Sequence, residues 1–237
     1  MTRHEGDYYP TPPCAVDALL RAVSDAFVPE LSLLYERRVP ALDPAAGAGT
    51  LLSWGAPQGC KTHAIELNPI LAEQCRIRGH ETIEGDALAI EPAREAAGWP
   101  GVPLMLLNPP NVLLAEFVRK ALRHALYYGS IACVLHPSQW SQTAEQAGLP
   151  VGDKVELTWR PPFIPKGTIS PKTGKLVGGP GQTYVWEIWT PAMVRYPRAS
   201  GRYMRVTRPP EDKARVEEHA RIAGAIGRLG IGTEGEA

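Results

Sequence analysis

The chain has 237 residues and a balanced formal charge, with 25 Lys and Arg against 25 Asp and Glu. Hydrophobic residues make up 44% and charged residues 21% of the sequence, close to the average of soluble globular proteins, which excludes a wholly disordered chain. No apolar run approaches the ~18 residues that a membrane span needs, and the first residues lack the apolar stretch of a signal peptide. We therefore expect a soluble protein that does not bind a membrane.

Charge and cysteine are distributed in ways that bear on partners and compartment. Residues 1–150 carry 11 Lys and Arg against 16 Asp and Glu, whereas residues 151–237 carry 14 against 9. A basic C-terminal part favours contact with a polyanion, although a charge-segregated surface without a partner explains the same counts equally well. The four cysteines are widely spaced and form no CxxC pair, which indicates reduced thiols of the cytoplasm rather than disulfides or a metal site.

The first part of the chain alternates helical and strand patterns. Apolar residues recur at helical spacing over 12–27, where Thr11 can cap the helix and Pro12 suits its first position. The next elements are expected to be, in order, a strand over 38–42, a strand over 63–67, a helix over 69–78 and a short strand at 82–83.

The middle of the chain contains a continuous apolar run over 102–107, which is typical of a buried parallel strand, and a second expected buried strand over 130–135. Between them the apolar positions of 113–128 recur at helical spacing. Strands and helices in alternation imply parallel βαβ units with helices on both faces of the sheet. The sequence therefore predicts an α/β protein.

The last third departs from this alternation. Residues 154–160 and 182–190 have strand character and are expected to pair antiparallel. The Gly-, Pro- and Lys-rich segment 161–181 between them is too long for a simple hairpin, and is either a disordered excursion or a functional loop. We expect one domain over 1–208, followed over 209–237 by a helix and a flexible tail.

Ligands of open α/β sheets bind at the carboxyl ends of parallel strands, and a glycine-rich segment follows the first strand. This segment, DPAAGAG from Asp43 to Gly49, has glycines that permit a tight turn and close approach of a ligand to the backbone. Leu52 stands in place of the third glycine of the dinucleotide fingerprint, and Asp43 would repel a pyrophosphate. A cofactor with a cationic group suits this loop better.

Two further carboxylates follow the next two strands. Glu66 ends the second strand, where a carboxylate can accept hydrogen bonds from both hydroxyls of a ribose. Asp86 can accept a hydrogen bond from the amino group of adenine, although Asp is also a common turn and helix-cap residue. Their order after Asp43, rather than either residue alone, favours a cofactor that contains a nucleoside.

The segment Asn108-Pro109-Pro110-Asn111, directly after a buried strand, is the most specific local signal. A carboxamide oxygen and a backbone carbonyl that accept the two hydrogens of an aryl or amide amine would orient its nitrogen and favour the pyramidal transition state. Pro109 removes a backbone donor and, with Pro110, stiffens the chain. A bare Asn-Pro-Pro is usually an ordinary strand terminator, but the surrounding motifs favour an amine-binding corner.

Together these residues resemble those of S-adenosylmethionine (SAM)-dependent amino methyltransferases, and most closely the small phage-type DNA N6-adenine methyltransferases. The resemblance spans about residues 7–190 and rests on Tyr9-x-Thr11-Pro12, Asp43-Pro44-x-x-Gly47-x-Gly49, Glu66, Gly85-Asp86, Asn108-Pro109-Pro110, Arg160-Pro161-Pro162-Phe163 and Tyr184-Val185-Trp186. It implies a Rossmann-like fold whose mostly parallel sheet has an antiparallel edge hairpin, with SAM as cofactor and DNA as partner. It also implies a phage- or prophage-encoded protein in the cytoplasm of a bacterial host.

The resemblance assigns roles to individual residues. The catalytic corner that grips the N6 amine of a flipped-out adenine would consist of Asn108, Pro109, Pro110 and Asn111. The cofactor would be held by Tyr9, Thr11, Pro12, Asp43, Pro44, Ala45, Gly47, Gly49, Glu66, Leu67, Asp86, Ala87 and Asn108. In this scheme Thr11 and Pro12 line the methionine end of the cofactor, and no metal takes part.

Asn111 departs from the family pattern, because this position normally carries Tyr, Phe or Trp, whose ring stacks on the flipped base. Such stacking is worth about 1–3 kcal/mol, so Asn111 implies weaker capture of the base or a different substrate. Tyr8, Trp140 and Phe163 are candidates for supplying a ring, and Lys166 for contacting the substrate's phosphates. An RNA or protein-amide acceptor, and a catalytically inactive SAM- or nucleic-acid-binding homologue, therefore stay open as alternatives.

The residues after position 150 leave little room for a separate target-recognition domain. The lysines of 161–181 would contact phosphates, which carry little sequence information, so we expect double-stranded DNA with short or relaxed sequence specificity. Five arginines between positions 195 and 208, interleaved with Tyr196 and Tyr203, form either an anion-binding strip or a solvated strand edge. The sequence makes no prediction of the oligomeric state.

Overall fold

The structure is a computed structural model that describes residues 10–90, 101–142, 148–163, 183–210 and 212–228. Tyr8, Tyr9, Lys166 and most of the segment 161–181, for which the sequence makes predictions, lie outside these described residues. Within the described part of the chain, no helix is both long and apolar enough to cross a membrane.

Eight strands form one sheet in the order β3-β2-β1-β4-β5-β7-β6-β8. They are β1 (Ala41–Asp43), β2 (Thr62–Glu66), β3 (Glu81–Glu84), β4 (Leu104–Leu107), β5 (Ile131–Pro137), β6 (Asp153–Leu157), β7 (Tyr184–Trp189) and β8 (Tyr203–Val206). Neighbouring strands are parallel except at β7, which is antiparallel to both β5 and β6. The predicted α/β fold with a mostly parallel sheet is thereby confirmed. The predicted hairpin is present as β6 and β7, but β8 pairs parallel to β6 and takes the edge position.

Seven helices accompany the sheet in the described residues. They are α1 (Pro13–Ser24), α2 (Pro29–Glu36), α3 (Thr50–Gly55), α4 (Pro69–Ile77), α5 (Leu114–Tyr128), α6 (Pro191–Arg195) and α7 (Lys213–Arg228), with 3-10 turns η1 (Asn111–Leu113) and η2 (Ser138–Gln142). The single helix predicted over 12–27 is too long, because α1 ends at Ser24 and Ala26 has a positive φ of 49°. Pro29 then opens α2, as proline suits a first helical turn.

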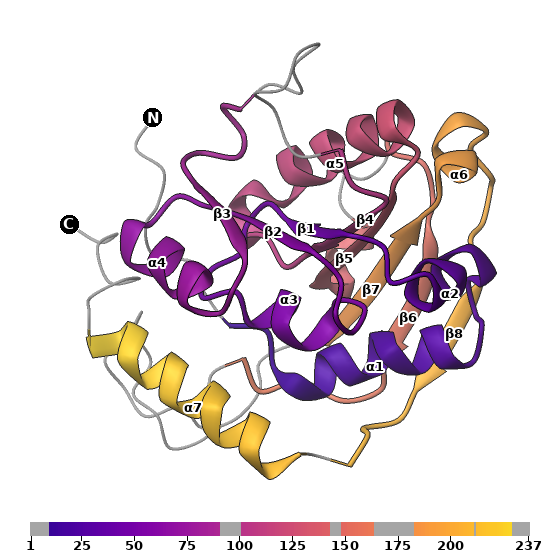
Figure 1. Cartoon of the computed structure of the whole chain (residues 1–237). Helices are drawn as coiled ribbons and strands as arrows, with labels where there is room; N and C mark the ends of the chain where they lie inside the picture. Colours follow the sequence, from indigo (N-terminus) through magenta and orange to yellow (C-terminus); the bar gives the residue numbers. More distant parts are fainter. Residues whose placement is uncertain (1–9, 91–100, 143–147, 164–182, 211, 229–237) are drawn as a thin grey trace.

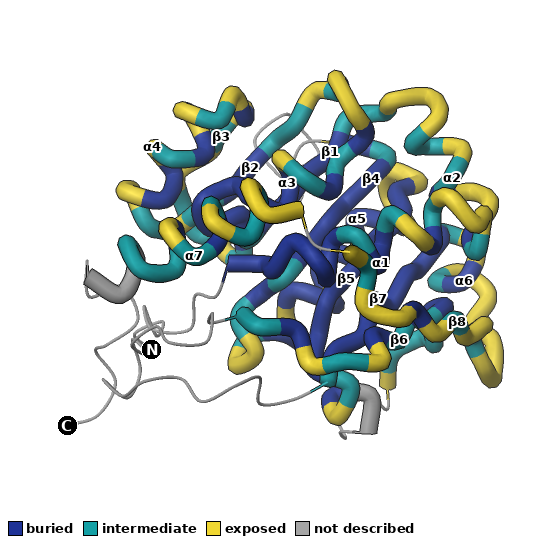
Figure 2. Tube along the Cα trace, turned by 90° about the horizontal axis from the view of Figure 1, so that it is seen from below, coloured by how far each residue is buried: buried dark blue, intermediate teal, exposed yellow. Residues whose placement is uncertain are grey.

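Two hydrophobic cores lie on opposite faces of the sheet, because successive side chains of a strand point to opposite sides. Leu104 and Leu106 of β4 pack in one core with residues of α1 and α3, whereas Met105 and Leu107 pack in the other with residues of α5. Figure 1 shows α5 on one face and α1 and α3 on the other. All residues of β4 and β5 are buried, and Figure 2 shows these strands in the middle of the molecule. This double burial explains their continuous apolar runs.

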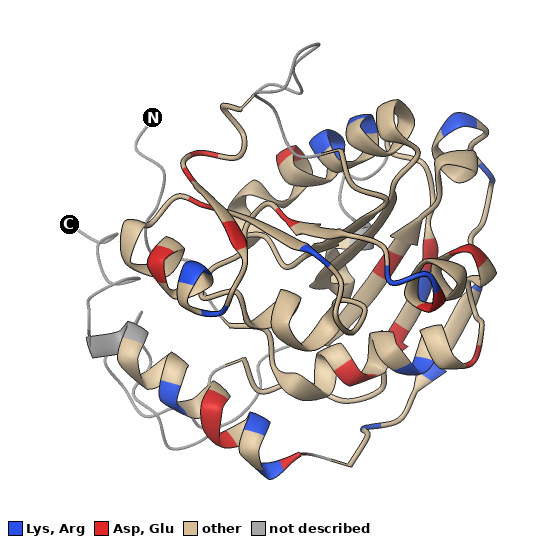
Figure 3. Cartoon of the chain, in the orientation of Figure 1, with Lys and Arg blue, Asp and Glu red and all other residues tan. Residues whose placement is uncertain are grey.

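The C-terminal helix α7 packs against the start of the described chain. Arg215 Nη1 donates to Asp17 Oδ1 of α1 at 2.7 Å, and both side chains are mostly buried. His219 is 2% exposed, and its Nε2 lies 3.1 Å from the carbonyl oxygen of Pro10. Acidic and basic residues are interspersed along the helix (Figure 3). Through these contacts α7 holds the backbone next to Thr11.

Candidate functional site

The candidate site lies at one edge of the sheet. β1, β2, β3 and β4 are parallel neighbours, so their carboxyl ends meet at that edge. Asp43 ends β1, Glu66 ends β2 and Asn108 directly follows β4. The structure therefore brings together three motifs that are far apart in the sequence.

The turn after β1 depends on glycine. Gly47 and Gly49 have φ values of 55° and 77°, in the left-handed region that residues with a side chain rarely adopt. A Cβ atom on Gly49 would also lie only 2.6 Å from Cδ2 of His80. The turn is tied to β2, because the N–H of Ala46 donates to the carbonyl oxygen of Ile65 at 3.1 Å. Backbone conformation and close packing thus both require a glycine at position 49.

The ring of His80 packs against this turn at Gly49. The sequence analysis did not identify His80 as a residue of the site. Its Nε2 lies 3.0 Å from the carbonyl oxygen of Gly49 and 3.1 Å from Ser53 Oγ, and its Nδ1 lies 2.8 Å from Thr62 Oγ1. Burial lowers the pKa of His80, which favours the neutral ring. A neutral ring with its hydrogen on Nε2 donates to Gly49 and accepts from Thr62. No local sequence motif predicts these contacts.

Glu66 is held by the backbone on both sides. Its Oε2 accepts a hydrogen bond from the N–H of Gly47 at 2.7 Å, and its Oε1 accepts one from Asn68 at 2.8 Å. Burial raises the pKa of the carboxyl, and these hydrogen bonds partly offset that rise. Because each carboxylate oxygen has more than one acceptor position, both can still accept a ligand hydroxyl.

Asp43 is a carboxyl group in a nearly dry environment, with only 1% of its surface exposed. Its pKa is raised to about 8, chiefly by burial and to a smaller degree by the nearby charge of Glu66, while a hydrogen bond from the Ala45 N–H opposes the rise. That hydrogen bond has a length of 2.9 Å. A cationic group placed next to Asp43 would favour its ionised form, so this pair of carboxyls suits a positively charged ligand.

Asp86 organises the loop after β3. Its Oδ1 accepts from the N–H of Leu88 at 2.9 Å, and its main-chain oxygen accepts from Ala89 at 3.0 Å. The N–H of Gly85 donates to the main-chain oxygen of Glu66 at 2.9 Å, which places this loop beside the carboxyl end of β2. Ala87 in the same loop is buried, whereas Leu67, which follows Glu66, is 49% exposed.

Asn108 is half-buried at the end of β4, and its side chain contacts the N-terminal segment. Asn108 Nδ2 donates to Thr11 Oγ1 at 3.0 Å, although the two residues are 97 positions apart. Thr11 is 3% exposed, so this contact is well shielded from water. With Nδ2 turned to Thr11, Oδ1 is the amide atom that can accept a hydrogen from a substrate amine.

The residues around this corner differ in exposure. Pro109 is buried, and Pro110 is half-buried. Asn111 is exposed and begins η1, in which the N–H of Leu113 donates to the carbonyl oxygen of Pro110 at 3.0 Å. The position that carries an aromatic ring in the resembling family therefore presents a small polar side chain to solvent.

The two described candidates for an aromatic partner are packed against other rings. Trp140 is 7% exposed, and its ring lies edge-to-face on that of His136, with 4.9 Å between the ring centroids. The half-buried Phe163 packs against Tyr184, with 4.3 Å between the centroids. Both rings therefore contribute to packing in this structure.

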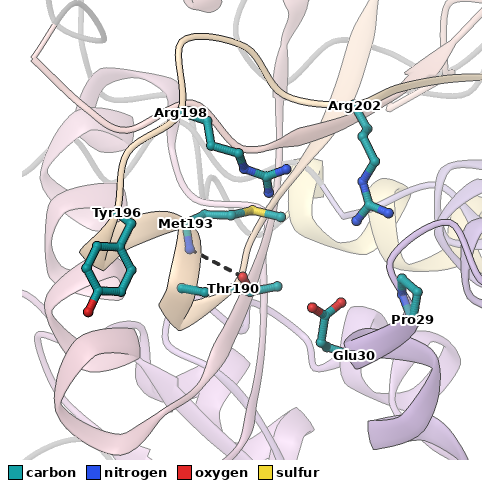
Figure 4. A pocket seen from close by; sticks show the side chains of 8 residues that line it. Pro29, Glu30, Thr190, Met193, Tyr196, Arg198 and Arg202 are labelled. Carbon is teal, nitrogen blue, oxygen red and sulfur yellow. Dashed lines mark hydrogen bonds between the residues drawn. The ribbon is translucent and has the colours of Figure 1, made fainter.

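The basic segment after α6 leads into β8, the outermost strand on the side of the sheet away from β3. Arg198 and Arg202 line a cavity of ≈ 530 Å³ together with Thr190, which follows the antiparallel strand β7 (Figure 4). Arg202 Nη2 lies 2.6 Å from Oδ2 of the buried Asp153 of β6. Arg205 of β8 pairs likewise with a carboxylate of β6, that of Glu156, at 2.8 Å. These ion pairs favour the solvated-edge interpretation of this segment over an anion-binding strip.

Comparison with known proteins gives a fold but no sequence family, since no family model and no curated protein matches the chain. A protein of Listeria monocytogenes assigned to the class I SAM-dependent methyltransferases superposes with a TM-score of 0.55 at 12% identity, over 94% of this chain and 74% of its own. The type I restriction-modification methyltransferase subunit of Streptococcus thermophilus gives 0.52 at 12% identity, over 95% of this chain and 54% of its own. A proposed RNA methyltransferase of Pyrococcus horikoshii superposes with a TM-score of 0.50 at 16% identity, over 80% of this chain and 89% of its own.

These likenesses identify the architecture. The chain has the Rossmann-like fold of class I SAM-dependent methyltransferases, with the strand order and the antiparallel β7 described above. At such low identity they concern the fold alone, so any activity is argued from the residues at the site.

Proposed function

We propose that this protein is a SAM-dependent methyltransferase that methylates the exocyclic N6 amine of adenine in DNA. The observation that carries the proposal is the convergence of Asp43, Glu66 and Asn108 at the carboxyl edge of adjacent parallel strands. In such folds this edge is where ligands bind. An acidic, glycine-lined cofactor site and an amine-binding corner then lie side by side.

The residues at this edge fit SAM. The buried Asp43, whose pKa is raised, suits a ligand that carries a sulfonium and an ammonium group. Glu66 would accept hydrogen bonds from the ribose hydroxyls, and Asp86 would accept one from the amino group of adenine. Gly47 and Gly49 would let the ligand approach the backbone closely. Thr11 and Pro12 would line the methionine end.

Asn108 and Pro109 would hold the target amine. When bound, SAM supplies a methyl group whose bond to sulfur breaks as the new bond to the amine nitrogen forms. Asn108 Oδ1 and the backbone carbonyl of Pro109 would accept the two amine hydrogens and favour a pyramidal nitrogen whose lone pair faces the methyl group. Thr11 fixes the amide of Asn108 in this orientation. The surplus amine proton leaves to water after transfer.

The choice of DNA rests on the likeness of the Asn-Pro-Pro corner to phage-type adenine methyltransferases, and a restriction-modification subunit is among the similar folds. We propose a double-stranded substrate from which adenine is flipped out, with relaxed sequence specificity, and a cytoplasmic protein of phage or prophage origin. RNA is the second candidate, because the exposed Asn111 removes the usual stacking ring and a proposed RNA methyltransferase has a similar fold.

The test is transfer of labelled methyl groups from SAM to a mixture of duplex DNA and RNA by the wild-type protein and by Asn108→Ala. At saturating SAM we expect Asn108→Ala to incorporate label about 10²- to 10³-fold more slowly, because it loses a hydrogen-bond acceptor in the transition state. Label that is removed by deoxyribonuclease supports DNA, and label removed only by ribonuclease supports the second candidate. Equal rates for both proteins would remove Asn108 from the mechanism.

A further inference from the structure

Lys120 lies on the side of α5 that meets the loop after β3. The residue is only 9% exposed, and its Nζ donates to the carbonyl oxygens of Ala87 at 2.7 Å and Leu88 at 3.2 Å. Nζ also donates to the carbonyl oxygen of Ile90. An ammonium group has three hydrogens, so these three acceptors match its donors. A buried cation is costly unless its donors are satisfied, and here one short loop satisfies them.

The same peptide groups contact Asp86 from their other side. The carbonyl of Ala87 and the N–H of Leu88 belong to one peptide group, and that N–H donates to Asp86 Oδ1 at 2.9 Å. The carbonyl of Leu88 and the N–H of Ala89 belong to the next one, and that N–H donates to the main-chain oxygen of Asp86 at 3.0 Å. Two planar peptide groups therefore stand between the ammonium and Asp86.

This arrangement both orients and strengthens the contacts of Asp86. A peptide group is rigid, so anchoring its oxygen to Lys120 also fixes the direction of its N–H. A positive charge at the carbonyl polarises the group and makes its N–H a better donor. The carboxylate of Asp86 is thereby held in one position by a residue on a different element, 34 positions away in the sequence.

We propose that Lys120 is a positioning residue that fixes the carboxylate of Asp86 for recognition of the 6-amino group of a bound adenine. This inference rests on the proposed function, because it presupposes a ligand that carries adenine. Hypoxanthine has a carbonyl oxygen in place of that amino group, and a fixed carboxylate repels it. Selectivity for adenine over hypoxanthine is therefore a joint property of Lys120 and Asp86.

The experiment compares the dissociation constants of S-adenosylhomocysteine and S-inosylhomocysteine by calorimetry. The wild-type protein is expected to prefer the adenine compound by ~10- to 100-fold, the range of one hydrogen bond to a charged group. Lys120→Met and Asp86→Asn should each lower this preference by ~10-fold or more. In the Asp86→Asn background, Lys120→Met should lower it no further, because Lys120 acts through Asp86. Arg123→Met, at an exposed position of the same helix, is the matched control and should keep the preference.

Each outcome decides the matter. A folded Lys120→Met protein with the wild-type preference, or a further loss in the double variant, would overturn the role of Lys120 and leave the proposed function standing. A folded wild-type protein that binds neither compound would overturn both. If Lys120→Met does not fold, Lys120→Gln replaces it, because the shorter side chain loses the ammonium but keeps two donors. An unchanged preference in Lys120→Gln would equally overturn the proposal.

Discussion

Asp43 is the residue whose chemistry depends most on its surroundings. An aspartate in an unfolded chain has a pKa of about 3.9, whereas burial raises that of Asp43 to about 8 in the folded protein. The folded state therefore binds a proton here that the unfolded state releases over much of the range between pH 4 and 8. A group with a raised pKa contributes stability at low pH, and this contribution is lost as the pH rises to the folded value.

The variant Asp43→Asn tests this linkage, because asparagine stays neutral at every pH. We expect the free energy of unfolding of the wild type, relative to that of Asp43→Asn, to fall between about pH 4 and pH 8 and to stay level above it. The slope cannot exceed about 1.4 kcal/mol per pH unit for one proton. Urea unfolding at a series of pH values measures it. Glu36→Gln, at an exposed position, is the control, and a difference independent of pH would contradict the prediction.

Single residues also show where sequence reasoning stops. The φ values of Gly47 and Gly49 are what a tight-turn interpretation of DPAAGAG requires, and that pattern is local. The ring of His80 beneath the turn is not foreseeable, because its contacts with Gly49 and Thr62 span 31 and 18 positions. Such contacts exist only once β2 and β3 are paired.

Among the elements, α7 is the one whose role only its packing reveals. The sequence predicts a helix followed by a flexible tail over 209–237, and α7 is found at Lys213–Arg228. Its contacts with Asp17 and Pro10 place it against the segment that carries Thr11, which in turn contacts Asn108. We therefore expect damage to α7 to weaken both folding and the site.

The variant Arg215→Ala tests this role. It removes the hydrogen bond to Asp17 and the stacking of the guanidinium on Trp54, whose ring centroid lies 5.3 Å away. We expect a loss of about 1–3 kcal/mol in the free energy of unfolding, the range of a hydrogen bond to a charged group, measured in urea. Arg221→Ala, at an exposed position of the same helix, should lose less than about 0.5 kcal/mol. Equal stability of Arg215→Ala and wild type would show that α7 is not held in this way.

At the scale of the whole molecule, cofactor binding and folding should be coupled. The candidate site draws residues from the N-terminal segment, β1, β2, the loop after β3 and the end of β4, so a ligand there binds only the folded chain. A ligand at 100 times its dissociation constant stabilises the native state by about 2.7 kcal/mol. For a domain of this size each kcal/mol raises the melting temperature by about 2–4 °C.

We accordingly expect S-adenosylhomocysteine at that concentration to raise the melting temperature by about 5–10 °C in thermal unfolding. NAD is the control, because Leu52 replaces the third glycine of the dinucleotide fingerprint and Asp43 would repel a pyrophosphate. NAD should leave the melting temperature unchanged. A shift with NAD and none with S-adenosylhomocysteine would reverse the choice of cofactor class.

The sequence by itself determined the order of the main strands and longer helices, and the places where ligand-binding residues follow the strands, but it did not predict the short helices α2, α3 and α6. Apolar runs such as Leu104–Leu107 report burial on both faces of a sheet, and polar residues directly after them mark its carboxyl edge. These signals are local, since they depend on side-chain periodicity and on turn chemistry within a few residues.

Only the tertiary structure decided which of these residues touch one another. It joined Asn108 to Thr11 and Lys120 to the loop of Asp86. It also paired Arg202 with Asp153, a partner that sequence spacing does not indicate. The physical reason is that such contacts join atoms many positions apart, and their distances are set by strand register and helix packing rather than by neighbouring residues.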